Sequence, residues 1–370
     1  MHVWLLEPYY TGSHAAWADG YVRYSRHAIR LFQLPGMFWK WRMHGGAVTL
    51  ARMIRDGDER PDLLLVTDML NLPAFLGLTR DRLAAVPVAI YFHENQLTYP
   101  LQPGEKRDLT YGFINFASAL AADAVLFNSR YHLESFFEEL PRLLKHFPDY
   151  NELWAIEAIR RKSQVLPVGV DLRRLDHWAD ERPLSADRPP VILWNQRWEY
   201  DKNPLEFFRA LYTLAERGLD FRVALCGQNF RLAPAEFEEA KARLGERIIH
   251  YGYASEEDYA RLLWQADIVV STALHDFFGV ALVEAIYCGA FPILPKRLTY
   301  PDLLPPVAHD RCLYTDFAGL VERLTWALTH RAEAQAMSLR QAVACYDWSN
   351  MAPIYDSVLE KVLNGLSGGH

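Results

Sequence analysis

Short runs of Val, Ile and Leu alternate with longer helical patterns along almost the whole chain, and this alternation restricts the fold more than any other feature. A strand that is apolar at every position is buried on both faces, so it belongs to a parallel sheet with helices on each side. Two series of such runs predict an α/β protein with two Rossmann-like domains. The predicted strands are 2–7, 62–67, 87–92, 124–128 and 164–167, then 190–195, 221–226, 247–251, 268–270 and 291–294; clear helices cover 204–217, 255–265 and 317–329.

The break between the two series falls in 171–190, which is charged, contains proline and lacks periodicity, as linkers do. We therefore predict an N-terminal domain at 1–175 and a C-terminal domain at 176–345. We expect a helix within 346–370 to pack back on the first domain. Two open α/β domains that face each other bring the carboxyl ends of both sheets to a deep interdomain cleft, where such folds bind ligands.

Composition excludes several classes of protein. Hydrophobic residues make up 51% and charged residues 23%, which excludes disorder and coiled coil. A net charge of −7 argues against a protein that coats nucleic acid without specificity. The four cysteines are scattered singly, which indicates buried thiols in a reducing compartment. The start lacks the features of a signal peptide and no apolar run reaches about 18 residues, so we expect a cytoplasmic protein without a membrane segment.

Two cations follow the strand at 190–195. Arg197 and Lys202 stand directly before a helix that Asn203 and Pro204 open with an N-cap and N1 signal. Guanidinium, ammonium and helix N-terminal amides all complement a diphosphate. The alternative is a solvated loop with an Arg–Asp pair.

A second group follows the strand at 268–270. Gly279, between Phe278 and Val280, would let a diphosphate approach the first amides of the next helix. Glu284 lies further along that helix, where a carboxylate can accept both hydroxyls of a ribose. The alternative is a capping carboxylate, Asp276, and an ordinary helix Glu.

The ordered motifs together resemble the retaining family 4 glycosyltransferases of GT-B fold. The matching residues are Arg197-x4-Lys202-Asn203-Pro204, Cys226-Gly227, Tyr251-Gly252, Asp276-x7-Glu284 and Gly289-Ala290. The resemblance implies that Arg197 and Lys202 bind the donor diphosphate and that Glu284 binds the ribose. It places the first carboxylate of the motif near the donor sugar, and here that residue is Asp276 where Glu is usual.

In the first half, His93 follows the strand at 87–92. In the same family a His after this strand contacts the transferred sugar; the alternative is a buried His bonded to backbone. Gly12 follows the first strand and would allow close passage of a phosphate or sugar, unless it is simply a turn. We assign Gly12, with Ser13 and Asn95 from the same two loops, to donor binding.

The phrases FHENQLTYP and NQRWEYDKNP are more specific and resemble the tRNA-queuosine mannosyltransferase family. This resemblance implies GDP-mannose as donor and the cyclopentenediol of queuosine in a tRNA anticodon loop as acceptor. It also implies transfer with retention, by front-face attack in which the leaving phosphate takes the acceptor proton and His93 orients the sugar. No HExxH or suitably placed DxD motif is present, so we expect neither a metal nor another cofactor.

Residues 21–55 contain seven basic side chains and no acidic one, interleaved with aromatic residues. Cations for phosphates and rings for splayed bases are what a single-stranded RNA loop requires. The alternative is a helix and a strand with a basic solvent face and aromatic residues in the core. The residues assigned to RNA are Arg23, Arg26, Lys40, Trp41, Arg42 and Arg52.

Three other functions stay open at this point. One is a family 4 enzyme that glycosylates a saccharide, lipid or small metabolite; another is a non-catalytic RNA- or nucleotide-sugar-binding protein; the third is an epimerase or phosphorylase. The choice of guanine over uracil depends on loops at 227–231 and 251–254 that the sequence does not place. The sequence does not give the oligomeric state.

Overall fold

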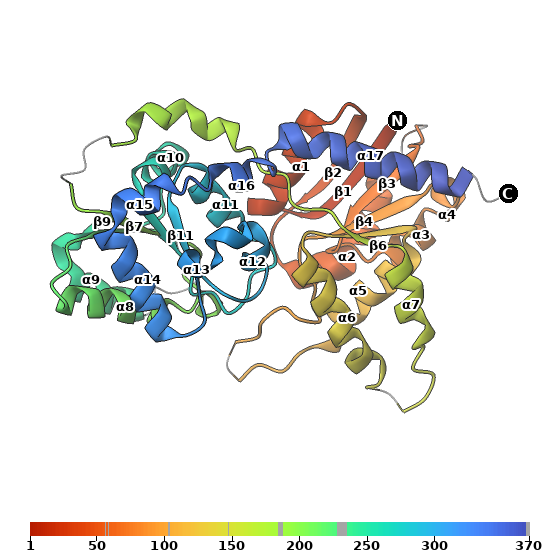
Figure 1. The fold of residues 1–370 in the computed structure, drawn as a ribbon. Helices are drawn as coiled ribbons and strands as arrows, with labels where there is room; N and C mark the ends of the chain where they lie inside the picture. The colour runs from red at the N-terminus through yellow and green to blue at the C-terminus, as the bar shows by residue number, and fades with distance from the viewer. Residues whose placement is uncertain are drawn as a thin grey trace. The chain divides into compact units, whose positions relative to one another are not determined.

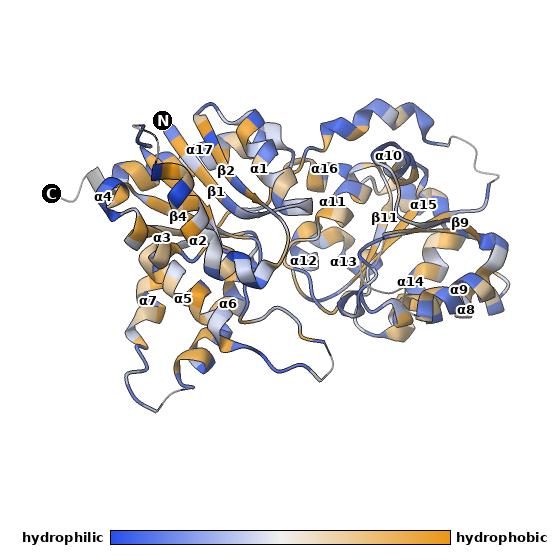
Figure 2. Cartoon of the chain, turned by 180° about the vertical axis from the view of Figure 1, so that it is seen from behind, coloured by the Kyte–Doolittle hydropathy of each residue, from blue (hydrophilic) through white to orange (hydrophobic). Residues whose placement is uncertain are grey.

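The computed structural model describes residues 1–367 except 56, 58, 103, 147, 184–187 and 228–234. Its contacts divide the chain into two units, Met1–Val170 with Trp348–His370, and Asp171–Asp347. Each unit has one six-stranded sheet in which every paired strand is parallel. Figures 1 and 2 show helices on the faces of both sheets and strands that are mostly hydrophobic. The predicted fold class is confirmed.

The first sheet has the strand order β2-β1-β3-β4-β5-β6. Five of its strands lie where the apolar runs predict them, whereas β2 was not predicted. β2 is an edge strand whose outer residues, such as Arg30 and Gln33, are exposed, so it lacks a continuous apolar run. The strands are β1 His2–Tyr10, β2 Ala28–Pro35, β3 Leu63–Thr67, β4 Val88–Phe92, β5 Ala124–Phe127 and β6 Ser163–Val165.

Two groups of helices cover opposite faces of this sheet (Figure 1). α1 and α17 lie on one face, and α2, α3, α5, α6 and α7 build the main apolar core on the other. The helices are α1 Gly12–Tyr24, α2 Trp39–Arg55, α3 Leu72–Leu78, α4 Arg80–Leu83, α5 Leu109–Ala121, α6 Arg130–Leu144, α7 Trp154–Arg161 and α17 Trp348–Ser367.

The last helix, α17, is held on α1 by specific contacts. A Cβ at Gly20 or Gly169 would come within 1.9 or 2.4 Å of the Trp348 indole, so glycine makes room for this ring. The Tyr21 hydroxyl donates to Asp356 Oδ1 at 2.9 Å. These contacts make the C-terminal helix part of the first unit.

The second sheet has the strand order β12-β11-β10-β7-β8-β9. Its central strands lie where predicted, and the two-residue β12 is too short for sequence periodicity to reveal. The strands are β7 Val191–Asn195, β8 Arg222–Cys226, β9 Ile248–Gly252, β10 Ile268–Val270, β11 Phe291–Pro295 and β12 Leu313–Tyr314. The helices are α8 Pro204–Glu216, α9 Ala235–Leu244, α10 Glu256–Gln265, α11 Val280–Tyr287, α12 Tyr300–Leu303, α13 His309–Cys312, α14 Phe317–Thr329, α15 Arg331–Ala336 and α16 Arg340–Ala344.

Part of the predicted linker is folded. The 3-10 helix η1 (Arg173–Glu181) packs on α10, where Trp264 Nε1 donates to the carbonyl of Leu175 at 2.7 Å. A second short helix, η2 (Tyr200–Lys202), follows β7. Leu175 is the only buried residue of η1, and one buried position gives no helical period, which explains why η1 was not predicted.

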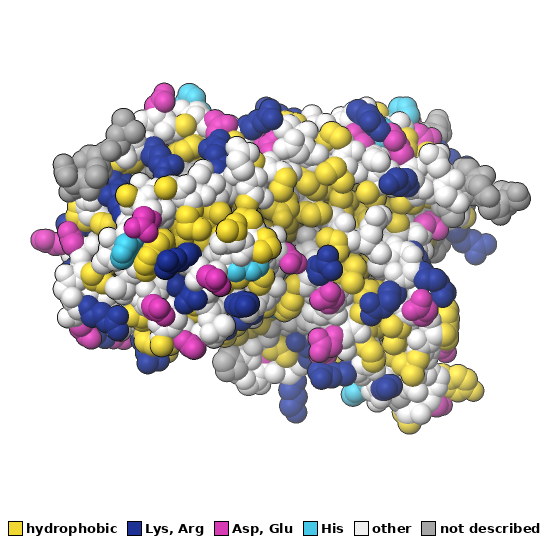
Figure 3. All heavy atoms as spheres, in the orientation of Figure 1, with side chains coloured by type: hydrophobic (Ala, Val, Ile, Leu, Met, Phe, Trp, Pro, Cys, Tyr) yellow, Lys and Arg dark blue, Asp and Glu magenta, His cyan; other side chains and the backbone are white. Residues whose placement is uncertain are grey.

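Two expectations from composition can be compared with the structure. Three cysteines are buried, but Cys345 is exposed, so the prediction of four buried thiols is wrong at this position. No helix in the described part of the chain is both long and apolar enough to cross a bilayer. On the face shown in Figure 3, basic and acidic side chains are interspersed rather than segregated by charge.

Candidate active site

In the second unit, two loops at the carboxyl ends of the neighbouring strands β7 and β10 are joined by hydrogen bonds. Lys202 Nζ, in η2, donates to the carbonyl of His275 at 2.8 Å. The same ammonium lies 3.3 Å from Asp201 Oδ2 and 3.9 Å from Asp276 Oδ2. The structure therefore brings Lys202 and Asp276 together, as the sequence predicts for residues that follow adjacent strands. Arg197, half-exposed in the same loop as Lys202, lies 3.4 Å from Glu199 Oε2.

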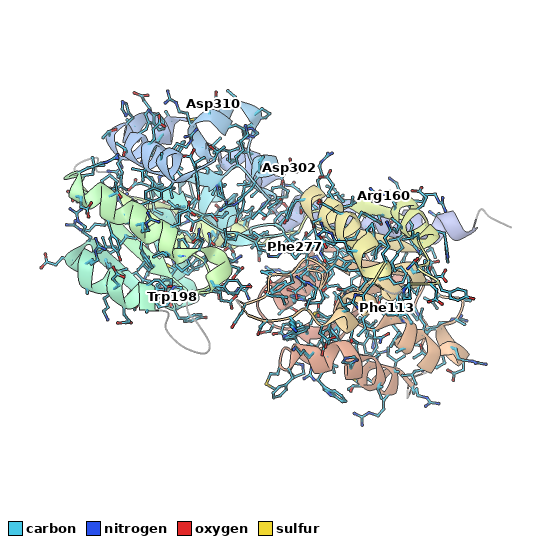
Figure 4. All side chains as sticks on the ribbon, turned by 90° about the horizontal axis from the view of Figure 1, so that it is seen from below. Phe113, Arg160, Trp198, Phe277, Asp302 and Asp310 are labelled. Carbon is cyan, nitrogen blue, oxygen red and sulfur yellow. The ribbon has the colours of Figure 1, made fainter. Side chains whose placement is uncertain are left out.

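Asp276 shapes the turn that leads into α11. Its Oδ1 accepts from the amide of Phe278 at 3.4 Å and its Oδ2 accepts from the Tyr300 hydroxyl at 3.1 Å. Gly279 then takes a left-handed conformation, φ +88°, as the N-cap of the helix that Val280 begins. A left-handed turn of this kind favours glycine, so the conformation and the open helix start both explain Gly279. Asp276 thus fixes the turn before α11, but it does not cap the helix, because the N-cap is Gly279 and no described side chain caps α11. Figure 4 labels Phe277 in this loop and Trp198 in the loop after β7.

Glu284, one and a half turns into α11, lies at the centre of a buried polar network. Its Oε1 accepts from Arg174 Nη2 at 2.6 Å, and its Oε2 accepts from the Tyr259 hydroxyl at 2.9 Å. Asn195 Nδ2 in turn donates to the Tyr259 oxygen at 3.1 Å. Burial raises the pKa of Glu284, while the Arg174 guanidinium opposes this rise. The carboxylate is thus fixed in position by neighbours on η1 and α10.

Several buried polar atoms beside Glu284 lack a partner. In the part of the chain that the structure describes, the Asn195 Oδ1 and both amide atoms of Gln196 make no hydrogen bond. Buried polar atoms in native proteins are almost always paired, so these atoms are available to hydrogen-bond a polar ligand or water. Gly227 borders them, since a Cβ there would lie 2.2 Å from the Gln196 carbonyl oxygen. Of the two loops expected to choose the donor base, 227–231 lies outside the described residues except for Gly227, whereas 251–254 is described.

In the first unit, His93 follows β4 as predicted, and its side chain is 8% exposed. Its backbone amide donates to Asp68 Oδ1 at 2.8 Å, and its ring lies 4.7 Å from that of Trp17. Burial, together with the charge of His14, lowers the pKa of His93 well below the ordinary value. His93 is therefore a neutral imidazole. Its Nε2 makes no hydrogen bond to any described residue and lies 4.0 Å from Glu7 Oε2.

Glu7 and His14 form a buried pair beside His93 that the sequence analysis missed. His14 Nδ1 lies 3.2 Å from Glu7 Oε2, and the His14 and His93 rings are 4.2 Å apart. Burial alone would lower the pKa of His14, but the Glu7 carboxylate, with smaller contributions from Asp68 and Glu94, raises it to about 9. Glu7 is a charged residue inside an apolar strand, and this feature of the sequence could have identified it as a candidate functional residue.

Glu7, His14 and His93 also offer three possible metal ligands within 4.8 Å of one another. A histidine must be deprotonated to bind a metal ion. His14 instead holds its proton at neutral pH because Glu7 stabilises the imidazolium. In this structure the Glu7 carboxylate and His14 form an ion pair.

The remaining predicted donor residues of this unit lie close to His93 in sequence or space. Gly12 (φ +51°) and Ser13 are exposed and begin α1, directly before His14. Asn95 is buried, and its Oδ1 accepts from the amides of Leu97 and Thr98 at 3.0 and 2.9 Å. Asn95 therefore shapes the loop after His93. Its Nδ2 makes no hydrogen bond among the residues described.

The predicted RNA-binding residues do not form one surface. Arg23 and Arg26 lie at and after the end of α1, and Arg26 Nη2 donates to Glu360 Oε1 of α17 at 2.6 Å. Lys40, Trp41, Arg42 and Arg52 all lie on α2, which covers the opposite face of the sheet (Figure 1). The two groups of residues are close in sequence but far apart on the sheet, because β2 separates the two helices and the chain crosses the sheet between them.

Comparison with known proteins places these features in context. Residues 2–170 match the family model described as tRNA-queuosine alpha-mannosyltransferase N-terminal, and residues 177–341 match glycosyl transferases group 1. A tRNA-queuosine alpha-mannosyltransferase of Drosophila melanogaster is 38% identical over 311 residues, 82% of this chain and 82% of that protein. A GDP-mannose:cellobiosyl-diphosphopolyprenol alpha-mannosyltransferase of Xanthomonas campestris is 25% identical over 210 residues, 55% of this chain and 54% of that protein. The structure of a sucrose-phosphate synthase from Thermosynechococcus elongatus superposes with a TM-score of 0.75 at 15% identity, covering 99% of this chain and 100% of that one.

Proposed function

Because this chain belongs to the tRNA-queuosine alpha-mannosyltransferase family of GT-B glycosyltransferases, we propose that it transfers mannose from GDP-mannose to the cyclopentenediol of queuosine in a tRNA anticodon loop. The observation that carries this proposal is the similarity to the Drosophila enzyme, which extends through both units. The match of the first unit to an N-terminal model of the same family supports the acceptor. An enzyme with this acceptor works in the cytoplasm, which is the proposed location.

The second unit supports binding of a nucleoside diphosphate sugar. Lys202 and Arg197 supply positive charge for the two phosphates, and the first amides of α11 after Gly279 add hydrogen-bond donors. Glu284 is a fixed acceptor for ribose hydroxyls. The Xanthomonas relative uses GDP-mannose according to its name, although its acceptor is different. This shared donor supports GDP-mannose for the present enzyme.

The proposed reaction retains the configuration at the anomeric carbon. The bond between this carbon and the β-phosphate oxygen breaks, and its electron pair leaves with GDP. A queuosine hydroxyl forms the new bond on the same face, and its proton passes to the departing phosphate oxygen. Lys202 and Arg197 stabilise the charge that accumulates on that phosphate. His93, as a neutral imidazole, orients the sugar by a hydrogen bond.

We propose that the reaction needs no metal ion or other cofactor. Lys202, Arg197 and the backbone amides of α11 stabilise the leaving-group charge in this proposal, in the role that a divalent cation has in metal-dependent enzymes. The compact Glu7, His14 and His93 group is an ion pair beside a neutral histidine in this proposal.

The decisive experiment identifies the product nucleoside. Purified enzyme is incubated with tRNA that contains or lacks queuosine, and separately with GDP-mannose, UDP-glucose or UDP-galactose, before digestion and mass spectrometry. We expect a hexose on queuosine with GDP-mannose only. Transfer to a saccharide or lipid but not to tRNA, or conversion of GDP-mannose without any acceptor, would contradict the proposal.

A further inference from the structure

The residue that precedes α2 has an unusual backbone conformation. Phe38 occupies the left-handed region, φ +52°, and its side chain is 77% exposed. Its carbonyl accepts from the amide of Trp41 at 2.8 Å, so Phe38 stands at the N-cap of the helix. Ser, Thr, Asp, Asn and Gly are the usual residues at an N-cap, and a bulky residue with positive φ is strained. Neither packing nor helix capping therefore explains a phenylalanine here.

Trp41, in the first turn of α2, is a second aromatic residue with a largely exposed side chain. Its side chain is 65% exposed, although the ring is held in a defined place. A Cβ at Gly45 would lie 2.8 Å from Trp41 Cε2, so glycine makes room for the indole to lie against the helix. The turn that presents Phe38 is fixed too, because Arg42 Nε donates to the Pro35 carbonyl at 3.0 Å. The Trp41 ring and the backbone turn that carries Phe38 are therefore both held in place.

The structure separates these two rings from the other aromatic residues of the basic segment 21–55. Tyr21 and Phe32 are buried, and Trp39 packs on Tyr111 with ring centroids 4.9 Å apart. They belong to the core, as the alternative interpretation of this segment expects. Among the large aromatic side chains of segment 21–55, only Phe38 and Trp41 are exposed.

The cations of the segment divide in the same way. Arg26 and Arg30 form ion pairs, with Glu360 and Glu59. Lys40 and Arg52 of α2 are exposed and have no carboxylate within 4.0 Å in the described parts of the chain. Asp108, the N-cap of α5, has a lowered pKa chiefly because Thr110 donates to it, and the charge of Lys40 contributes to this shift. The exposed face of α2 therefore combines two rings with positive charge that is not neutralised locally.

We propose that α2 and its leading turn bind a single-stranded RNA segment, with Phe38 and Trp41 stacked on nucleobases and Lys40 and Arg52 on phosphates. This inference rests on the proposed function, and it names the element that holds the loop of the acceptor tRNA. Stacking on aromatic rings and attraction of phosphates to cations are the two interactions by which proteins bind single-stranded RNA.

An RNA partner fits this surface better than a membrane. An interfacial helix separates a continuous apolar face from a basic face. On α2 the exposed residues alternate along one side, where His44 lies between Trp41 and Val48, and Arg52 follows Val48. On this side of α2, His44 separates Trp41 from Val48, so the helix presents no continuous apolar stripe there.

The test measures affinity for fluorescently labelled tRNA without donor, together with KM for queuosine-containing tRNA. Phe38→Ala and Trp41→Ala should each weaken tRNA binding roughly tenfold, since stacking contributes that much per base, and should raise KM for tRNA similarly. Phe38→Tyr keeps a ring and should restore affinity. KM for GDP-mannose should match that of the wild type in all of these variants.

Two further comparisons separate stacking from charge. Lys40→Gln and Arg52→Gln should each reduce the slope of log affinity against log salt by about one, whereas the ring variants should keep the wild-type slope. Tyr150→Ala is the matched control, because Tyr150 is also an exposed aromatic residue (87%) with positive φ (+47°) in the same unit but has Asp149 and Glu152 as neighbours. This control should bind tRNA like the wild type.

Three results would overturn the inference. They are unchanged tRNA affinity in both ring variants, equal weakening by Tyr150→Ala, and ring-dependent binding to vesicles containing phosphatidylserine while tRNA affinity is unaffected. The proposed function and this inference can fail separately. Transfer to queuosine with an unchanged KM in the ring variants refutes only the inference, whereas ring-dependent tRNA binding without any transfer refutes only the proposed reaction.

Discussion

The pair of Glu7 and His14 predicts a pH-dependent stability of the first unit. The pKa of His14 rises from 6.5 to about 9 on folding, because the buried Glu7 carboxylate stabilises the imidazolium. One pKa unit corresponds to about 1.4 kcal/mol, so this rise is worth roughly 3 kcal/mol of stability. For a folded unit of this size, that is on the order of 10 °C in Tm.

The sign follows from the raised pKa. Below about pH 6.5 His14 is protonated in both states, and the ion pair contributes fully to stability. As the pH rises toward 9, the unfolded chain loses the proton while the folded unit keeps it, so the contribution falls. Above about 9 it is lost. His14→Gln removes the titrating group and retains a side chain that can donate a hydrogen bond to Glu7.

The assay is differential scanning calorimetry of wild type and His14→Gln from pH 6 to 9.5. We expect the wild type to be more stable at pH 6, and we expect the difference in Tm to shrink steadily toward pH 9. His2→Gln changes an exposed histidine of the same unit and should follow the wild type at every pH. A difference between wild type and His14→Gln that is constant, or that grows with pH, would refute the pairing.

Three further predictions concern catalysis and packing. Arg197→Ala should lower kcat/KM by roughly two to three orders of magnitude while circular dichroism and Tm stay unchanged, since this half-exposed side chain stabilises leaving-group charge and packs little. Dialysis against EDTA should leave the initial rate unaltered, and a loss that Mn²⁺ or Mg²⁺ restores would disprove metal independence. Gly169→Ala should destabilise the first unit by about 1–3 kcal/mol, because the new methyl overlaps the Trp348 indole; limited proteolysis should then release α17 earlier than in the wild type.

The sequence predicts best what depends on local pattern. Buried parallel strands such as β3 and β7 are continuous apolar runs, and they lie where the runs indicate. Edge and very short strands escaped prediction, because β2 exposes alternate residues and β12 has only two. Loops after strands located Lys202, Asp276 and His93 for the same topological reason, since parallel strands end at one edge of their sheet.

The sequence alone could not predict which side chains from distant parts of the chain contact one another. Glu284 was predicted from spacing, but the side chains that fix its carboxylate, Arg174 and Tyr259, come from elements 110 and 25 residues away. The basic segment 21–55 is the opposite case, in which residues close in sequence lie apart in the structure. Its uniform charge along the chain suggests a single basic patch. Folding sends Arg26 to an ion pair on one face of the sheet and Lys40 to the other. A net charge of −7 is therefore compatible with the proposed binding of RNA by α2, because binding a single RNA loop requires a cationic face no larger than this helix.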